Sequence, residues 1–383
     1  MKLSDGKKAA LRRNRENTIE RGRKNRHMMK FDKVVAVSLV LIGVAMTLVI
    51  VIKAVTREDV SDAVPENYYK VMANYENETD DVDAEPGKVE GMPVSMMKEP
   101  TPVSCWGDSF TLTADEGTTS YAGILAGELN RTVYNIAADR DSLLGVAGRE
   151  GGIPLMVTPF IIPEDKTPAE IVLNNENGNK TWLDLSKNAG LNPCEICGVE
   201  GMISRMGDKM YFTRSASGER TMVMETQPVT TRGMNLRLSD ITVFFVGSDD
   251  MFADTEATVK VYRAMVDNLD EGNDKYIVMG PVRGDLAVMQ ALETALAAEF
   301  GDHFVNIRQK LCEDAEKPHD SFTLTDADIK LAKTGVIPES YFASEEYFSS
   351  LGTYATGMIA ADSMRSLGFF DDEKIEETTA EAQ

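Results

Sequence analysis

The chain has 383 residues, of which 43% are hydrophobic and 27% are charged, and its formal net charge is -22. This length allows one large domain or two ordinary ones, and the composition excludes a disordered chain. The charge is uneven, because residues 1–33 hold twelve Lys or Arg against four Asp or Glu, a balance of +8. The remainder therefore carries -30, and like-charge repulsion argues against nucleic acid or another polyanion as a partner.

Residues 34–52 are uncharged and include thirteen Val, Leu or Ile, a run long enough to span the hydrocarbon of a bilayer. Those thirteen contribute on the order of -5 kcal/mol to insertion. A cleaved signal peptide is the main alternative, but the run exceeds a signal h-region and no A-x-A-like cleavage site follows it. We therefore predict an uncleaved transmembrane helix over residues 34–53.

The charges that flank this segment predict its orientation. Basic residues precede it and acidic residues follow it, so the positive-inside rule places residues 1–33 in the cytoplasm as a basic segment. The basic cluster resembles a nucleic-acid arm, but beside a membrane span it is better explained as a topology and anionic-lipid signal. We expect a single-pass protein of the cell membrane whose main domain lies outside it.

Beyond the span, residues 54–101 are acidic and proline-rich, which predicts a stalk or linker. A folded domain is expected over residues 102–370, followed by a disordered acidic tail over residues 371–383. Within the folded domain, apolar periodicity predicts strands and helices in alternation. The strands are expected at 103–106, 132–137, 241–246, 276–279 and 304–307, and the helices at 121–129, 254–268, 286–300 and 348–367.

This alternation predicts an α/β fold with a doubly wound parallel sheet covered on both faces, and such sheets place their sites at the carboxyl ends of the strands. Between about residues 152 and 233 the pattern changes. Alternating segments at 169–173, 181–185, 210–213 and 221–224, separated by turn residues, predict a small antiparallel β insert. The insert is either a structural embellishment or a lid that shapes a substrate site.

The first predicted strand ends in Gly107-Asp108-Ser109. A Ser on the turn that leaves a buried strand exposes its hydroxyl above the sheet, with backbone amides nearby to hold an oxyanion. This motif in this position resembles the SGNH or GDSL hydrolases, and the likeness extends from about residue 102 to residue 370. The resemblance implies a flavodoxin-like three-layer fold, Ser109 as the nucleophile, and esterase or acyl-transferase activity, often on acylated glycans.

The same resemblance shows where the chain departs from the family. A Gly whose amide helps to form the oxyanion hole aligns with Arg140, so that amide is retained only if Arg140 adopts the needed backbone angles. The Asn that donates to the oxyanion aligns with Asp249, which accepts hydrogen bonds and repels negative charge. The orienting Asp and the general-base His align with Ser344 and Tyr347, and tyrosine is a poor base at neutral pH.

Two other groups are candidate substitutes for the missing base. His319 lies in the loop that leads toward Ser344 and Tyr347, and Asp249 lies near the nucleophile, whereas His303 precedes the fifth strand and should face away from Ser109. Cys194 and Cys197 form one C-x-x-C without a second pair, which leaves open a disulfide, a redox pair or two buried thiols. No phosphate loop or metal-ligand set is present in the sequence, so neither a cofactor nor a metal is predicted.

The leading hypothesis is therefore a membrane-tethered SGNH-like domain with impaired hydrolysis, which acts as a binding or scaffolding module for a cell-surface glycan. The alternative is an active serine esterase or acyl transferase that deacetylates acylated glycans through Ser109, with His319 or Asp249 as the base.

Overall fold

The computed structural model describes residues 82–84, 100–113, 119–174, 188–317 and 324–371. The chain divides into two units, Met1–Val64 and Pro65–Gln383, and every described residue belongs to the second. Within these ranges no helix is long and apolar enough to cross a membrane. The predicted cytoplasmic segment, the predicted span at 34–53 and residues 372–383 of the predicted tail lie outside them.

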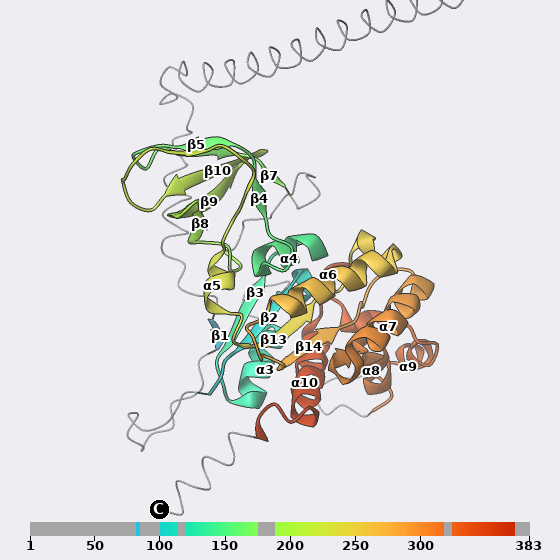
Figure 1. Ribbon diagram of the computed structural model, residues 1–383. Coiled ribbons are helices and arrows are strands. Elements are labelled where there is room, and N and C mark those ends of the chain that lie inside the picture. Colours follow the sequence, from blue (N-terminus) through green and yellow to red (C-terminus); the bar gives the residue numbers. More distant parts are fainter. Residues whose placement is uncertain (1–81, 85–99, 114–118, 175–187, 318–323, 372–383) are drawn as a thin grey trace, which may run out of the picture. The chain divides into compact units, whose positions relative to one another are not determined.

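The described part of the chain contains a mixed α/β fold built on a parallel sheet of five strands, which confirms the predicted fold class at this level (Figure 1). A sixth strand, β1, pairs antiparallel with β3 at one edge. The sheet therefore includes three residues of the predicted stalk. In spatial order the strands are β1 (Val82–Ala84), β3 (Val133–Ala137), β2 (Val103–Gly107), β13 (Ile241–Phe245), β14 (Tyr276–Met279) and β15 (Phe304–Val305).

Helices cover both faces of this sheet because alternate residues of each strand point in opposite directions. Val243 and Phe245 pack into a core cluster with helices α3 (Tyr121–Leu129), α8 (Ile307–Asp314) and α10 (Ser350–Ser366). Phe244 packs into a second cluster with α4 (Leu143–Glu150), α6 (Thr255–Asn268) and α7 (Leu286–Phe300). The continuous apolar run of β13, buried at every position, is what a strand covered on both faces requires.

Two differences from the sequence-based elements have local causes. The fifth strand is shorter than predicted, because the Asn306 side chain accepts from the Gln309 amide and so starts α8 where the strand was expected to continue. Helix α4 was not predicted, although Ser142 caps its first turn and Gly151, with φ of 107°, ends it. The short helices α5 (Arg232–Leu236) and α9 (Asp326–Ala332) were not predicted either.

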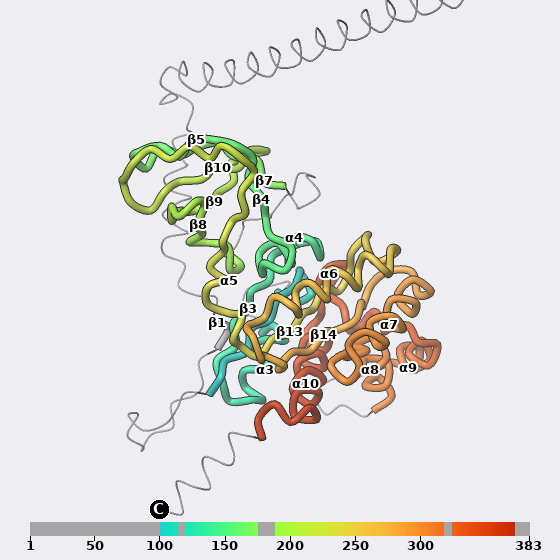
Figure 2. Tube along the Cα trace, in the orientation of Figure 1, coloured from blue at the N-terminus to red at the C-terminus, as the bar shows by residue number. Residues whose placement is uncertain are grey.

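Between α4 and α5 the chain makes an excursion through antiparallel strands, which Figure 2 traces from green to yellow-green. These strands are β4 (Met156–Val157), β5 (Phe160–Ile162), β6 (Ala169–Ile171), β7 (Leu173–Asn174), β8 (Cys194–Ile196), β9 (Val199–Met206), β10 (Lys209–Arg214), β11 (Thr221–Val223) and β12 (Gln227–Pro228). They enclose a separate apolar cluster that includes Ile203 and Phe212. The strand predicted at 181–185 lies outside the described residues.

Arg149 in α4 joins this insert to the sheet. The guanidinium of Arg149 contacts Asp141 at 2.7 Å, and both side chains are only 1% exposed. The same guanidinium donates to the carbonyl oxygens of Ile136 in β3, Gly107 in β2 and Ala189 in the insert. Because Gly107 and Ile136 lie at the carboxyl ends of their strands, Arg149 also fixes the backbone from which the candidate site begins.

Candidate functional site

The turn that carries Ser109 starts from a glycine that no other residue can replace without movement. A Cβ on Gly107 would lie 2.2 Å from the carbonyl oxygen of Phe245 and 2.3 Å from the hydroxyl of Thr111. The close approach of β2 to β13 lets the chain turn directly into a short 3-10 helix, η2 (Ser109–Thr111). Ser109 is thereby placed at the carboxyl edge of the parallel sheet.

Asp108 holds this turn against the neighbouring loop. Its carboxyl accepts from the amide of Phe110 at 3.0 Å and from the amide of Gly247, just beyond β13, at 2.9 Å. Burial raises the pKa of Asp108 to about 7, although the bonds from Phe110, Gly247 and Ser248 act in the opposite direction. The carboxyl is therefore a structural connector between the loops after β2 and β13.

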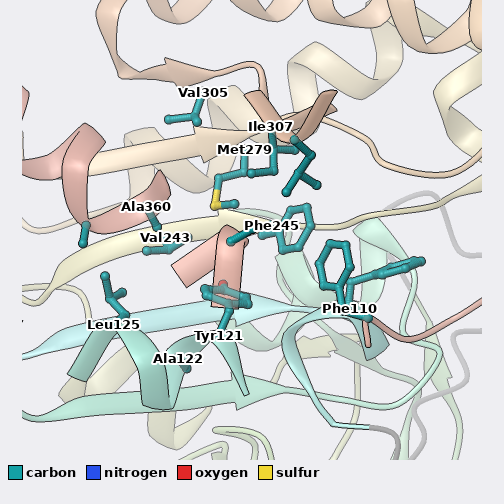
Figure 3. Close-up of a cluster of buried hydrophobic side chains, with 14 of the residues drawn as sticks. Phe110, Tyr121, Ala122, Leu125, Val243, Phe245, Met279, Val305, Ile307 and Ala360 are labelled. Carbon is teal, nitrogen blue, oxygen red and sulfur yellow. The ribbon is translucent and has the colours of Figure 1, made fainter. Parts of the chain in front are cut away.

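Phe110 anchors the same turn through contacts with other aromatic rings. Its ring lies 5.2 Å from that of Phe348 and 6.1 Å from that of Phe342, both edge-on. Figure 3 labels Phe110 and Phe245 among the side chains of this buried cluster. Because Phe342 and Phe348 flank Tyr347 in sequence, this aromatic packing brings the segment that carries Tyr347 to Ser109.

The hydroxyl of Ser109 is hydrogen-bonded to two groups of the loop that leaves β3. It donates to Oδ1 of Asp139 at 2.9 Å, and it accepts from the backbone amide of Arg140 at 2.7 Å. Tyr347 donates its own hydroxyl to the same Oδ1 of Asp139. The structure therefore brings together Ser109, Arg140 and Tyr347, three of the residues singled out from the sequence, around Asp139.

Sequence reasoning did not single out Asp139, although it directly precedes Arg140 in the loop that leaves β3. Its position after a predicted strand could have indicated that it lies near Ser109, because loops at the carboxyl ends of adjacent parallel strands lie next to one another. The carboxylate contacts the Arg140 guanidinium at 3.2 Å. Its negative charge is thus shared among two hydroxyl donors and one cation.

Tyr347 is a hydrogen-bond donor here and not a base. Burial raises the pKa of its phenol to about 12, and the hydrogen bond to Asp139 adds to that increase. At neutral pH the hydroxyl therefore keeps its proton and directs it at the carboxylate.

Arg140 adopts the backbone conformation that the resemblance requires. Its φ is 50°, in the left-handed region that glycine occupies more easily. In this conformation its amide points at the Ser109 oxygen. The amide expected for an oxyanion hole is present, but its proton is bonded to the Ser109 hydroxyl.

The other residues predicted from the resemblance are turned away from Ser109. The two oxygens of Asp249 accept from the amides of Leu143 and Met251, both at 2.7 Å, so this carboxylate is bonded to the first residue of α4 and to its own turn. The exposed Ser344 accepts from the amide of Glu346 through its hydroxyl. Neither side chain has a contact with Ser109 among the described interactions.

The histidines do not supply a base within the described residues. The ring of His303 lies at 2.7 Å from the carbonyl oxygen of Tyr276, the first residue of β14 and hence at the opposite end of the sheet from Ser109. His319 and His27 fall outside the described ranges. The site that the structure describes is thus a serine, a carboxylate and a phenol without an imidazole.

The C-x-x-C is not a disulfide. None of the four cysteines forms a disulfide; Cys194 is buried and Cys197 is exposed, at the turn between β8 and β9. Of the three alternatives, two buried thiols is therefore wrong as well, because Cys197 is exposed. Because residues of a strand alternate between faces, Cys194 points into the core of the insert, where burial raises the pKa of its thiol to about 12.

No group of three or more His, Cys, Asp or Glu side chains in the described ranges is arranged to hold a metal ion. Comparison of the chain with protein-family models, curated proteins and solved structures finds no match.

Proposed function

We propose that the chain is a single-pass protein of the cell membrane, with a cytoplasmic amino terminus and an extracytoplasmic main domain of the SGNH hydrolase type. The strand order β3-β2-β13-β14-β15 supports this proposal, because in chain order it reads second, first, third, fourth and fifth, as in flavodoxin-like sheets. In such sheets the ligand site lies where the strand order reverses, between β2 and β13. Ser109 and Gly247 lie on the two loops at that point.

We further propose that hydrolysis is impaired and that the domain acts as a binding or scaffolding module for a cell-surface glycan. The observation that carries this proposal is the hydrogen bond from the Ser109 hydroxyl to a carboxylate, made by a residue that is only 2% exposed. A carboxylate is a much weaker base than an imidazole. Removing the base from a serine hydrolase lowers turnover on the order of a million-fold.

The oxyanion side supports the same conclusion. In the described structure the Asp249 carboxylate is bonded to backbone amides, and the Arg140 amide donates to Ser109 itself. Loss of one oxyanion donor alone costs roughly 10²–10³ in turnover. A bound ester would therefore meet few free donors at its carbonyl oxygen.

A second candidate, an active serine esterase or acyl transferase, is favoured by one contact. Oδ1 of Asp139 lies 2.9 Å from the Ser109 oxygen, close enough to accept its proton during attack on an ester. Asp139 is better placed for this role than Asp249, whose oxygens are bonded elsewhere. Against it, the same oxygen of Asp139 also receives the Tyr347 hydroxyl.

Both candidates are tested by treating the full chain, solubilised in detergent, with a fluorophosphonate probe and a panel of acetyl esters. The impaired-module proposal expects no more labelling or turnover than Ser109→Ala shows. Labelling that is lost in Ser109→Ala and in Asp139→Asn, but retained in the control Asp249→Asn, would replace it with the esterase. Labelling lost in His319→Ala would also overturn the proposal and identify that histidine as the base.

A further inference from the structure

A groove of about 740 Å³ lies at the opposite edge of the sheet from β1, lined by residues of α7, β15 and α8. Its volume falls in the range of roughly 300–1,000 Å³ that small-molecule sites occupy. From β2 to β15 there are three strand spacings, roughly 14 Å, so the groove is separate from the Ser109 turn.

A buried ion pair forms a rigid part of the groove wall. The guanidinium of Arg308 in α8 makes two bonds to the carboxylate of Glu293 in α7, and the side chains are 8% and 6% exposed. Asn306 also donates to Glu293, and Arg308 donates to the carbonyl oxygen of Gly335. Each charge is matched inside the protein, so the pair fixes the two helices and offers no unpaired charge to an ion.

The side chains along the two helices repeat at helical spacing. Gln290, Thr294 and Ala297 follow one another at i, i+4 and i+7 on α7, and α8 contributes Gln309 and Glu313 from its facing side. Most of these groups are amides or hydroxyls that can both donate and accept, and all five side chains are exposed.

The charge and the apolar lining narrow the ligand class further. The two acidic groups of the groove, Glu293 and Glu313, are balanced by Arg308 and Lys310, although the whole chain carries -22. A charged ligand would gain little from a neutral groove. Phe304, partly buried at the edge strand, adds one apolar surface. The lining therefore suits a neutral ligand that carries many hydroxyl groups and an apolar face.

We infer that this groove binds a neutral oligosaccharide chain. The inference rests on the proposed role as a glycan-binding module and gives that module a binding site away from Ser109. The ligand would exchange hydrogen bonds with Gln290, Thr294 and Gln309, and its apolar face would lie against Phe304. Because the walls are two helices joined by a buried ion pair, the site is formed before the ligand arrives.

Two neighbouring alanines of α7 offer a matched test. Ala297 lines the groove, whereas Ala298 is also exposed but does not line it. The full chain is purified in a polyoxyethylene detergent, which carries no sugar, and titrated calorimetrically with cellotetraose and with the β-1,4 tetramer of N-acetylglucosamine. We expect saturable binding of at least one tetramer, weakened at least tenfold by Ala297→Trp and unchanged by Ala298→Trp.

A second variant, Gln309→Ala, removes a wall amide without adding bulk and should also weaken binding. The inference is overturned if neither tetramer binds, or if Ala297→Trp and Gln309→Ala bind as the wild type does. If binding is lost only in Ser109→Ala, the groove is not the site, but the proposed binding module stands with its site at Ser109. Fluorophosphonate reactivity would count against the module while leaving the groove measurement interpretable.

Discussion

Replacement of Arg149 by Met is expected to destabilise the main domain by about 5 kcal/mol. The change keeps an unbranched apolar stem but removes the guanidinium, and it leaves the Asp141 carboxylate, which is 1% exposed, without its partner. An uncompensated buried charge costs roughly 3–5 kcal/mol. The carbonyl oxygens of Ile136 and Ala189 also lose a donor, and each such loss costs roughly 1 kcal/mol or more.

The destabilisation should depend on pH, and its sign follows from Asp141. Burial raises the pKa of this carboxyl, and the adjacent Arg149 acts to lower it. Without Arg149 the folded-state pKa rises further, so the folded variant holds a proton that the unfolded chain releases. Stability is then lost as pH increases through the raised pKa, and the variant should be closer to the wild type at pH 5 than at pH 8.

Urea unfolding of the full chain in detergent measures this effect through the fluorescence of buried Trp106, whose ring centre lies 5.9 Å from the Arg149 guanidinium. Lys260→Met is the matched control, because it breaks an exposed ion pair with Glu256 and should change nothing measurable. If the free energy of unfolding of Arg149→Met lies within about 1 kcal/mol of the wild-type value at both pH values, the buried charge of Asp141 does not need Arg149 as its partner, and the prediction is refuted.

Three further predictions concern single side chains. Burial raises the pKa of Glu150 to about 8, so the stability of the domain should fall as pH rises from 6 to 9. Glu150→Gln should flatten this dependence in urea titrations, and equal slopes in variant and wild type would contradict the raised pKa of Glu150. Tyr347→His places an imidazole beside Ser109 and Asp139. Fluorophosphonate labelling of this variant should exceed that of the double variant Tyr347→His, Ser109→Ala by about 10²-fold. Equal labelling would mean that residue 347 does not occupy the place of the base. Exposed Cys197 should react with a membrane-impermeant maleimide on intact cells, whereas Cys197→Ser should not; labelling only after lysis would place the domain inside.

The sequence by itself predicted the elements whose patterns are local. The continuous apolar run at 241–246 and the largely apolar stretch at 286–300 predicted β13 and α7, because a buried element leaves a local run of apolar residues in the chain. The alternation of such elements predicted a parallel sheet, and the sheet placed Ser109 at its carboxyl edge. Helix α4 was missed because it has only eight residues, too few to establish a helical period, although Ser142 and Gly151 cap its two ends.

What only the tertiary structure decided is the set of partners around Ser109. The resemblance aligned Tyr347 with the base that acts on Ser109, but no pattern along the chain records that the two hydroxyls, 238 residues apart, meet at the carboxylate of Asp139. Likewise Asp249 looked like a neighbour of the nucleophile, yet the amides of Leu143 and Met251 bind its oxygens. A carboxylate is bonded by whichever donors folding brings within about 3 Å, and that choice depends on the packing of separate loops.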